Sequence, residues 1–240
     1  FARYMIKSVG GYVAMSDSVL KDAKSFDDTK PCSLTPHPLY DNFGDKVSRD
    51  EAIAHLRLDA GQRYILFFGL IRDYKGLDLL LRAFADKRLR GKNVKLLVAG
   101  EFYSNAERYE QLEQELELAQ HIVWCKEFIP ADEVRYYFAV ADLVAQPYKS
   151  ATQSGITQIA YHFERPMLVT DVGGLAEIVP HGKVGYVVKP NADDIADALV
   201  DFINHKQDSD FSTGIAEEKI KYTWDKMTAT LIDVANKVNQ

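Results

Sequence analysis

The chain has 240 residues, of which 47% are hydrophobic, and a formal net charge of -6 at pH 7. This length suits one large domain or one and a half smaller ones, and the apolar fraction is enough for a real core. The negative charge argues against a nucleic-acid surface, because phosphate backbones attract basic faces, but it leaves room for a local basic pocket.

The sequence gives no support to a membrane-spanning protein, a secreted protein, or a protein built on a metal cluster or disulfides. No apolar run approaches the ~18–20 residues that span a bilayer, and no signal peptide is visible. Cys32 and Cys125 are too few and too far apart for a metal cluster or a disulfide framework, so we expect a reduced, cytoplasmic compartment. The chain opens with Phe1 on residues typical of mid-protein sequence, and we expect a fragment whose N-terminal portion is missing. A processed mature chain is the alternative.

Short apolar or β-branched runs that end in Gly, Pro or Asp predict strands, and apolar spacing near three and four predicts helices. The predicted strands are Tyr12–Met15, Ser33–Thr35, Tyr64–Phe68, Lys95–Ala99, His121–Cys125, Leu143–Gln146, Met167–Thr170 and Gly185–Val188. The predicted helices are Leu77–Phe84, Asn105–Ala119, Asp132–Ala141, Ile156–Phe163, Ala192–Asn204 and Trp224–Val238, with Ser16 as the cap of an earlier helix. This alternation predicts an α/β fold, a Rossmann-like parallel sheet with helices on both faces.

The segment Gly69–Gly76 follows a predicted strand and carries two cations, Arg72 and Lys75, before a helix. Cations at the carboxyl end of a strand, close to helix amides, form a site for a diphosphate. An ordinary solvated charge pair is the alternative, but cations are disfavoured at a helix N-terminus unless an anion is present. We therefore predict that both side chains bind a nucleotide-linked substrate.

A second turn of small residues opens another helix further along the chain. Its members are Thr152, Gln153, Ser154, Gly155, Ile156 and Thr157. The amides after Gly155 are predicted to cradle the diphosphate, and the side chains of Thr152, Gln153 and Ser154 to bind sugar or phosphate oxygens. A capped helix start without a ligand is compatible with the same residues, because Ser and Thr are good caps.

From about Ser33 to Trp224 the chain resembles the C-terminal, donor-binding half of the GT-B glycosyltransferases of family 4. The matching segments, in the order of the family, are Phe67-Phe68-Gly69 with Arg72, Lys75 and Gly76; Leu97–Glu101; Phe128-Ile129-Pro130 with Glu133-Val134; Tyr137-Phe138 with Ala141-Asp142; Gln146-Pro147-Tyr148; Gly155-Ile156; Pro166; Gly173–Val179; and Gly185–Val188. Each segment alone is weak, and the ordered set is specific.

The resemblance implies retaining transfer of a sugar from a UDP- or GDP-linked donor, without a metal or other cofactor. The acceptor, a glycan or lipid-linked molecule, is then bound mainly by an N-terminal domain, and this fragment alone is expected to be inactive. Cell-envelope polysaccharide or glycolipid synthesis, with peripheral contact at the inner face of the membrane, is a family-level expectation. We expect residues 1–36 to be the remnant of that domain and its linker, residues 37–222 the nucleotide-sugar-binding domain, and residues 223–240 a helix crossing back.

The resemblance also assigns further site residues. Arg72 and Lys75 become catalytic, because they stabilise the charge that grows on the leaving nucleotide. Phe128, Ile129 and Pro130 are expected beside the base, where a plain loop before a helix is the alternative. The remaining predicted donor contacts are Gly69, Glu101, Gly173 and Gly174. A simple strand-to-helix turn explains Gly173-Gly174 equally well.

One departure from the family matters. The family places one Glu before the second turn and another inside the helix, and the corresponding positions here are Thr152 and Ala160, or Ala151 and Ile159. Neither choice restores a carboxylate, so Glu101 and Gln158 are candidate replacements. The departure motivates an alternative, a degenerate module that binds nucleotide sugars and transfers nothing. A related GT-B enzyme such as a nucleotide-sugar epimerase is a third reading, which the Arg72–Lys75 and Gly173–Glu177 arrangement fits less well.

Overall fold

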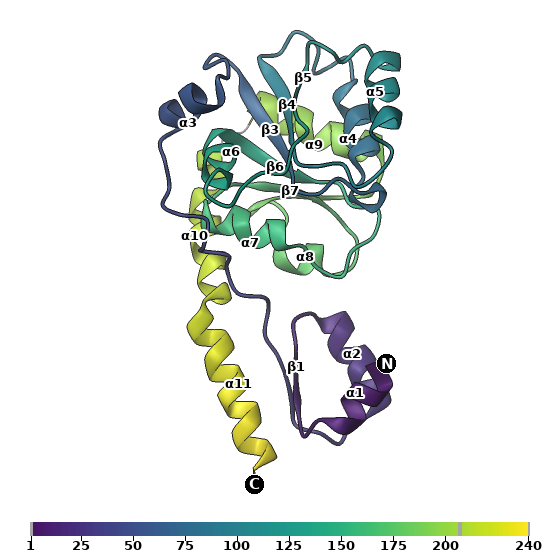
Figure 1. The fold of residues 1–240 in the computed structure, drawn as a ribbon, viewed down its shortest axis with the longest axis vertical. Coiled ribbons are helices and arrows are strands. Elements are labelled where there is room, and N and C mark those ends of the chain that lie inside the picture. The colour runs from purple at the N-terminus through teal and green to yellow at the C-terminus, as the bar shows by residue number, and fades with distance from the viewer. Residues whose placement is uncertain (1, 206–207, 240) are drawn as a thin grey trace.

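The computed structural model describes residues 2–205 and 208–239 and is built around a parallel sheet of six strands (Figure 1). The strands lie in the order β5-β4-β3-β6-β7-β8. Their bounds are β3 Arg63–Phe68, β4 Val94–Ala99, β5 Ile122–Cys125, β6 Ala141–Gln146, β7 Met167–Thr170 and β8 Gly185–Val188. The predicted Rossmann-like α/β fold is therefore confirmed.

Strands β3 and β6 are neighbours, although β4 and β5 lie between them in the sequence. From β3 the chain adds strands outward on one side, and from β6 it adds them on the other. This reversal makes the carboxyl ends of β3 and β6 the topological switch point, where open α/β sheets leave a crevice for ligands. The two predicted ligand loops, Gly69–Gly76 and Thr152–Thr157, follow these two strands.

Helices cover both faces of this sheet (Figure 1). On one face α4 packs against α5 and α9, and on the other α3 packs on α6 and α10 contacts α7. The bounds are α3 Arg49–Leu56, α4 Leu77–Phe84, α5 Ala106–Glu115, α6 Val134–Val140, α7 Gly155–His162, α8 Leu175–Ile178, α9 Ala192–His205 and α10 Ser212–Lys219, with 3-10 helices η1 Asp73–Lys75, η2 Asp208–Phe211 and η3 Ile220–Tyr222.

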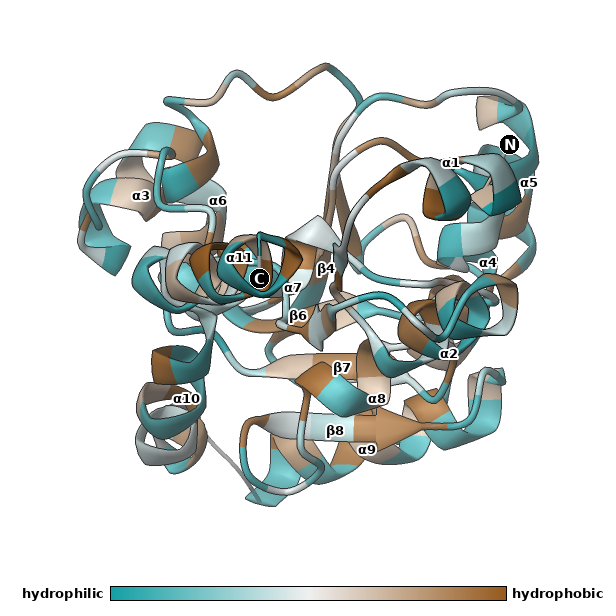
Figure 2. Ribbon diagram, turned by 90° about the horizontal axis from the view of Figure 1, so that it is seen from below, coloured by the Kyte–Doolittle hydropathy of each residue, from teal (hydrophilic) through white to brown (hydrophobic). Residues whose placement is uncertain are grey.

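The core forms because the central strands are apolar on both of their faces. Leu66, Phe67, Val98 and Val144 are all at most 1% exposed, as a parallel sheet between two helical layers requires. In Figure 2 strand β7 is apolar in colour, whereas α3 and α10 at the periphery carry long hydrophilic stretches. This rigid centre is what holds the two switch-point loops in place.

A smaller unit lies beside the sheet and is connected to it by an extended segment (Figure 1). It contains α1 Ala2–Ser8, β1 Tyr12–Ala14, α2 Asp17–Phe26 and β2 Cys32–Leu34, and β1 pairs with β2 in parallel. The C-terminal helix α11, Trp224–Val238, runs alongside this unit and contacts both of its strands. Close packing brings Val238 against the position that a Cβ on Gly10 would occupy, 2.6 Å away.

The predicted elements are recovered with shifts of a few residues at their ends. The helix predicted over Asn105–Ala119 is shorter, because α5 ends at Glu115 and Glu117 adopts a left-handed φ of 55°. Four of the described α-helices are absent from the prediction, the short α1 and α8 and the longer α3 and α10. The low amphipathic contrast of α3 and α10 explains why they were missed, although Ser48, whose side chain accepts from the Glu51 amide at 3.1 Å, is a recognisable N-cap of α3.

No helix within residues 2–205 and 208–239 combines the length and the apolar character needed to cross a bilayer.

Gly76 offers a test of how tightly the switch-point loops are packed. Its φ is +70°, and a Cβ there would lie 1.9 Å from the carbonyl oxygen of Pro147. We expect Gly76→Ala to lower the free energy of unfolding by more than ~3 kcal/mol, since left-handed strain and a backbone clash both contribute. Urea unfolding monitored by circular dichroism measures this.

Gly182 is the matched control for that experiment. Its φ is +74°, and no atom lies within 4 Å of a Cβ built on it. Gly182→Ala should therefore cost only the conformational term, ~1–2 kcal/mol. Equal losses in the two variants would show that the two loops do not pack as closely as described.

Candidate functional site

The loops after β3 and β6 contact each other directly at the switch point. The Lys149 amide donates to the Tyr74 carbonyl at 2.7 Å, and the rings of Tyr74 and Tyr148 meet edge to face with centroids 5.8 Å apart. Gly76 allows this approach because it has no side chain toward Pro147. The two loops thus form one surface rather than two separate turns.

Lys75 is the central residue of this surface. Its side chain is buried, with 8% of the residue exposed, and its Nζ lies 3.3 Å from the position of a Cβ on Gly69 and 6.0 Å from the centroid of the Tyr148 ring. Within the described residues no carboxylate is paired with it. Burial, and next the nearby positive charge of Arg72, lower the pKa of Lys75 to about 8. A buried cation without an internal counter-charge is a strong attractor for an anion.

The N-terminus of α7 lies on the other side of this ammonium. The Cδ1 atom of Ile156 is 3.4 Å from the same Gly69 Cβ position, so Lys75 and the start of α7 share one space. Ser154 is the N-cap, and its hydroxyl accepts from the Ile156 amide at 3.2 Å while it lies 3.1 Å from the Tyr148 hydroxyl. The first turn of a helix presents free N–H groups and a partial positive charge, which adds to the charge of Lys75.

Lys75 and this helix start line one cavity of about 260 Å³. The other lining residues are Tyr40, Phe43, Tyr74, Tyr148, Gln153, Ser154, Gly155, Ile156 and Ile159. Arg72 is not among them. Its guanidinium lies over the Tyr103 ring at 4.5 Å and is exposed, so it stands at the outside of the cavity next to Lys75.

A second cavity, of about 410 Å³, opens on the other side of Gly69. Its lining residues are Phe43, Phe68, Gly69, Leu70, Gly100, Glu101, Phe128, Ile129, Ala131 and Val134. Four residues predicted separately from the sequence, Gly69, Glu101, Phe128 and Ile129, therefore lie together. Pro130 instead lines a neighbouring pocket, which it shares with Phe128 and Ile129.

An exposed ion cluster holds the turn that carries Lys75. Asp73 accepts from Arg108 at 2.6 Å and from Lys149 at 3.1 Å, and both cations also contact Asp78, at 3.2 and 3.0 Å. The hydrogen bonds from Lys149 and Arg108 lower the pKa of Asp73 below its usual value. These charges neutralise one another outside the cavity, whereas Lys75 within it has no such partner.

Several of the predicted donor-binding residues also make contacts within the protein. The Gln153 amide donates to the carbonyl of Met15, and the Thr157 hydroxyl donates to the Ser154 carbonyl at 2.5 Å with the residue fully buried. Gly174 donates its N–H to the Thr152 carbonyl at 3.2 Å. A Cβ on Gly173 would lie 1.5 Å from the Ala151 carbonyl oxygen, so this glycine allows two loops to pack together.

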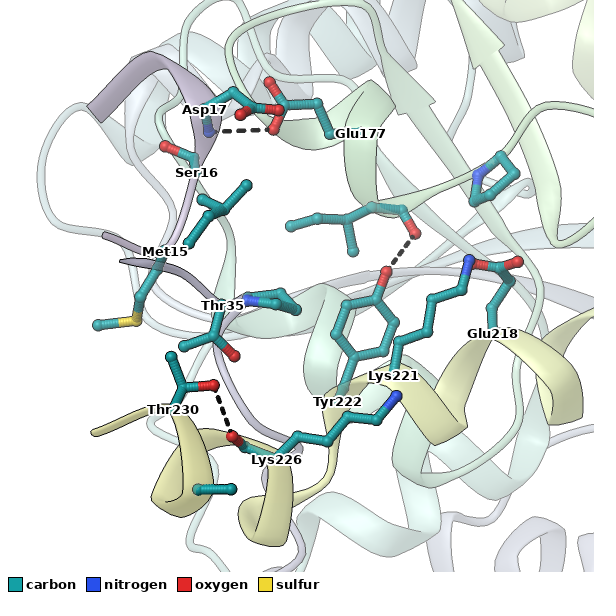
Figure 3. A pocket seen from close by; sticks show the side chains of 15 residues that line it. Met15, Ser16, Asp17, Thr35, Glu177, Glu218, Lys221, Tyr222, Lys226 and Thr230 are labelled. Carbon is teal, nitrogen blue, oxygen red and sulfur yellow. Dashed lines mark hydrogen bonds and ion pairs between the residues drawn. The ribbon is translucent and has the colours of Figure 1, made fainter. Parts of the chain in front are cut away.

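A third pocket, of about 610 Å³, lies where the small unit meets α8, η3 and α11 (Figure 3). Across it the Asp17 amide donates to the Glu177 carboxylate at 3.5 Å. The Tyr222 hydroxyl donates to the Ile178 carbonyl at 3.3 Å, and Lys221 turns away toward Glu218 at 2.6 Å (Figure 3). None of the predicted donor residues lines this pocket. The small unit contacts the second switch-point loop through the Met15 carbonyl, which accepts from Gln153.

The sequence analysis assigned no role to Tyr40 and Phe43, because they lie in an irregular segment before the first strand of the sheet. Phe43 lines both cavities, and the Tyr40 ring packs on Gly155, with Cε2 3.0 Å from a Cβ built there. Tyr40 is held by His37, whose Nε2 is 3.2 Å from the Tyr40 hydroxyl. The available signal was the presence of large aromatic side chains in an otherwise polar segment.

Comparison with known proteins decides the family. The model of the family described as "Glycosyl transferases group 1" matches residues 62–205, which include both switch-point loops. The chain belongs to the glycosyl transferases group 1. Similar relatives include the D-inositol 3-phosphate glycosyltransferase of Nocardia farcinica, 34% identical over 158 residues, which cover 63% of this chain and 35% of that protein. The lipopolysaccharide 1,2-N-acetylglucosaminetransferase of Salmonella typhimurium is 26% identical over 210 residues, 81% of this chain and 54% of that enzyme.

Solved structures share the fold of this group 1 chain. The sucrose-phosphate synthase of Thermosynechococcus elongatus superposes with a TM-score of 0.80 at 18% identity, over 98% of this chain and 60% of that one. The Anabaena protein HepE, solved in complex with UDP, superposes with a TM-score of 0.82 at 15% identity, over 99% of this chain and 68% of that one. The curated relatives are longer, and this chain spans only about a third to a half of them.

The buried ammonium of Lys75 predicts a pH dependence of stability in the unliganded protein. Its pKa is about 8 in the folded state and 10.5 in the reference state, so between these values the unfolded chain holds one more proton. Stability then rises with pH across this window, by on the order of 2–3 kcal/mol. Urea unfolding of wild type and Lys75→Gln between pH 7.5 and 10 measures the difference.

Other lysines and tyrosines titrate in the same range, so the informative quantity is the free energy of unfolding of wild type minus that of the variant at each pH. This difference should increase as pH rises. A difference that stays flat would show that Lys75 is not desolvated in the folded protein.

Proposed function

We propose that the chain is the donor-binding part of a retaining, GT-B glycosyltransferase of family 4. It takes a sugar from a nucleoside diphosphate sugar, UDP- or GDP-linked, and the acceptor is a glycan or a lipid-linked glycan. The observation that carries the proposal is Lys75, a buried ammonium without a carboxylate partner in the described residues, which faces the N-terminus of α7 at the switch point. A linked pair of phosphates supplies the missing negative charge.

The chemistry follows from where charge develops. When the bond between the anomeric carbon and the phosphate oxygen breaks, negative charge grows on the leaving diphosphate. Lys75 and the first amides of α7 are already aimed at this point, and Arg72 stands beside it, so they stabilise the charge without reorganising. These side chains and backbone amides supply the stabilisation, and we propose that no metal ion takes part.

The comparisons support this choice of substrate class. HepE was solved in complex with UDP and with UDP-glucose, and the curated relatives are named as glycosyltransferases. Retention of configuration rests on the resemblance to family 4. We place the acceptor, and any peripheral membrane contact, on the part of the relatives that this chain does not span, and expect the enzyme at the cytoplasmic side of the membrane.

Titration calorimetry with GDP and UDP tests the diphosphate site. We expect Lys75→Gln and Arg72→Ala each to weaken binding at least tenfold, about 1.4 kcal/mol or more, because each removes a cation from the diphosphate. Lys92→Gln is the matched control, since it removes the same charge from an exposed turn at the amino end of β4, on the opposite edge of the sheet. Equal affinities in wild type, Lys75→Gln and Arg72→Ala would remove these residues from the site.

The second candidate function is a binding module that transfers nothing. The positions where the family has carboxylates favour it, because neither Thr152 and Ala160 nor Ala151 and Ile159 supply an acid. A protein that joins this chain to the acceptor domain of its relatives should release the sugar from at least one donor in a panel, and Lys75→Gln should reduce that rate at least a hundredfold. Diphosphate binding without any release across the panel would favour the module.

A further inference from the structure

The 410 Å³ cavity contains a single charged side chain, that of Glu101, among its lining residues. The rest of the lining is apolar or glycine. Phe128 stands at the mouth with 73% of its surface exposed, and Phe68 lies deeper with 8% exposed. An apolar cavity with an aromatic ring at its mouth suits a flat ring of a ligand, and the single carboxylate can fix the orientation of that ring by a polar contact.

The backbone of Glu101 is fixed, although its side chain is exposed toward the cavity. The Ile71 amide donates to the Glu101 carbonyl at 2.8 Å, and the Gly100 amide donates to the Cys125 carbonyl at 2.8 Å. Gly100 has a φ of +146°, and a Cβ there would lie 2.3 Å from the Gly69 carbonyl oxygen. Within the described part of the chain the Glu101 carboxylate has no ion pair or hydrogen bond, so both of its oxygens are available as acceptors.

The two cavities are adjacent, as one nucleotide requires. Gly69 lies between them, because it lines the 410 Å³ cavity and stands 3.3 Å from Lys75 Nζ when measured from its Cβ position. Phe43 lines both cavities. A diphosphate at Lys75 therefore places the attached nucleoside toward Glu101.

We infer that Glu101 reads the base and that the nucleotide of this chain is a guanosine diphosphate. This inference rests on the proposed function and narrows its donor. Guanine presents N1–H and the 2-amino group side by side, two donors that match the two oxygens of one carboxylate. Uracil presents a single N–H between two carbonyl oxygens, which repel a carboxylate. An ionised carboxylate facing two donors gives the stronger, charge-assisted pair.

The test compares the affinities of GDP, IDP, UDP and ADP for the whole chain by calorimetry. Inosine diphosphate lacks only the 2-amino group, so it isolates that contact. We expect GDP to bind at least tenfold more tightly than UDP, about 1.4 kcal/mol, with IDP between them. In Glu101→Gln the GDP/UDP ratio should fall at least fivefold, because an amide cannot accept from both donors.

Glu127→Gln is the control variant. It removes the same charge from the loop that carries Phe128, and Glu127 lines the neighbouring pocket instead of this one. Removal of a negative charge near a diphosphate strengthens binding of all the nucleotides alike, so the base ratio, and not the absolute affinity, is the readout. In Glu127→Gln the ratio should stay at the wild-type value.

The possible outcomes distinguish a failure of the base assignment from a failure of the proposed function. If UDP binds as tightly as GDP, or if Glu101→Gln leaves the ratio unchanged, the base assignment is overturned while the diphosphate site stands. If none of the four nucleotides binds, the proposed function fails as well. A tight GDP complex whose preference disappears in Glu101→Gln supports both.

Discussion

The site depends on one buried ammonium at the point where the sheet reverses its strand order. Placing the charge of Lys75 in a mostly apolar environment is costly, by several kcal/mol for an unpaired ion. The fold tolerates this unfavourable free energy because the turn that carries the lysine is held between two rigid strands and a helix. Under the proposed function, the burial that lowers the stability of the free protein also favours binding of an anion.

Charges around the site are divided between two environments. Asp73, Asp78, Arg108 and Lys149 form an exposed cluster in which each charge has partners within 3.2 Å. Exposed pairs of this kind contribute little energy each, but a network of several fixes geometry. Lys75 follows Asp73 by two residues and is kept out of the cluster by its burial. The paired charges of the cluster hold the turn in place from outside. The unpaired charge of Lys75, on the inner side of the same turn, attracts an anion.

Local patterns in the sequence predicted the sheet well. The strands were recovered because buried parallel strands are apolar throughout, and the cation pair was recognised because it follows a strand and precedes a helix. What local patterns could not supply were contacts between distant segments. Phe43 was assigned no role, yet it lines both cavities, and the hydrogen bond from Gln153 to the Met15 carbonyl joins two segments that are far apart in the sequence. Both contacts depend on how the fold brings distant segments of the chain together.

The two helix positions at which the family's acid could fall differ in their surroundings. Ala160 is fully buried in the core and lines neither cavity, whereas Ile159 lines the cavity of Lys75. Gln158, the candidate replacement, is 1% exposed and lines neither cavity. A carboxylate at position 159 would line the same cavity as Lys75, and its charge would oppose the entry of an anion. Isoleucine leaves the described lining of that cavity without an acidic side chain, which under the proposed function favours the diphosphate of the donor.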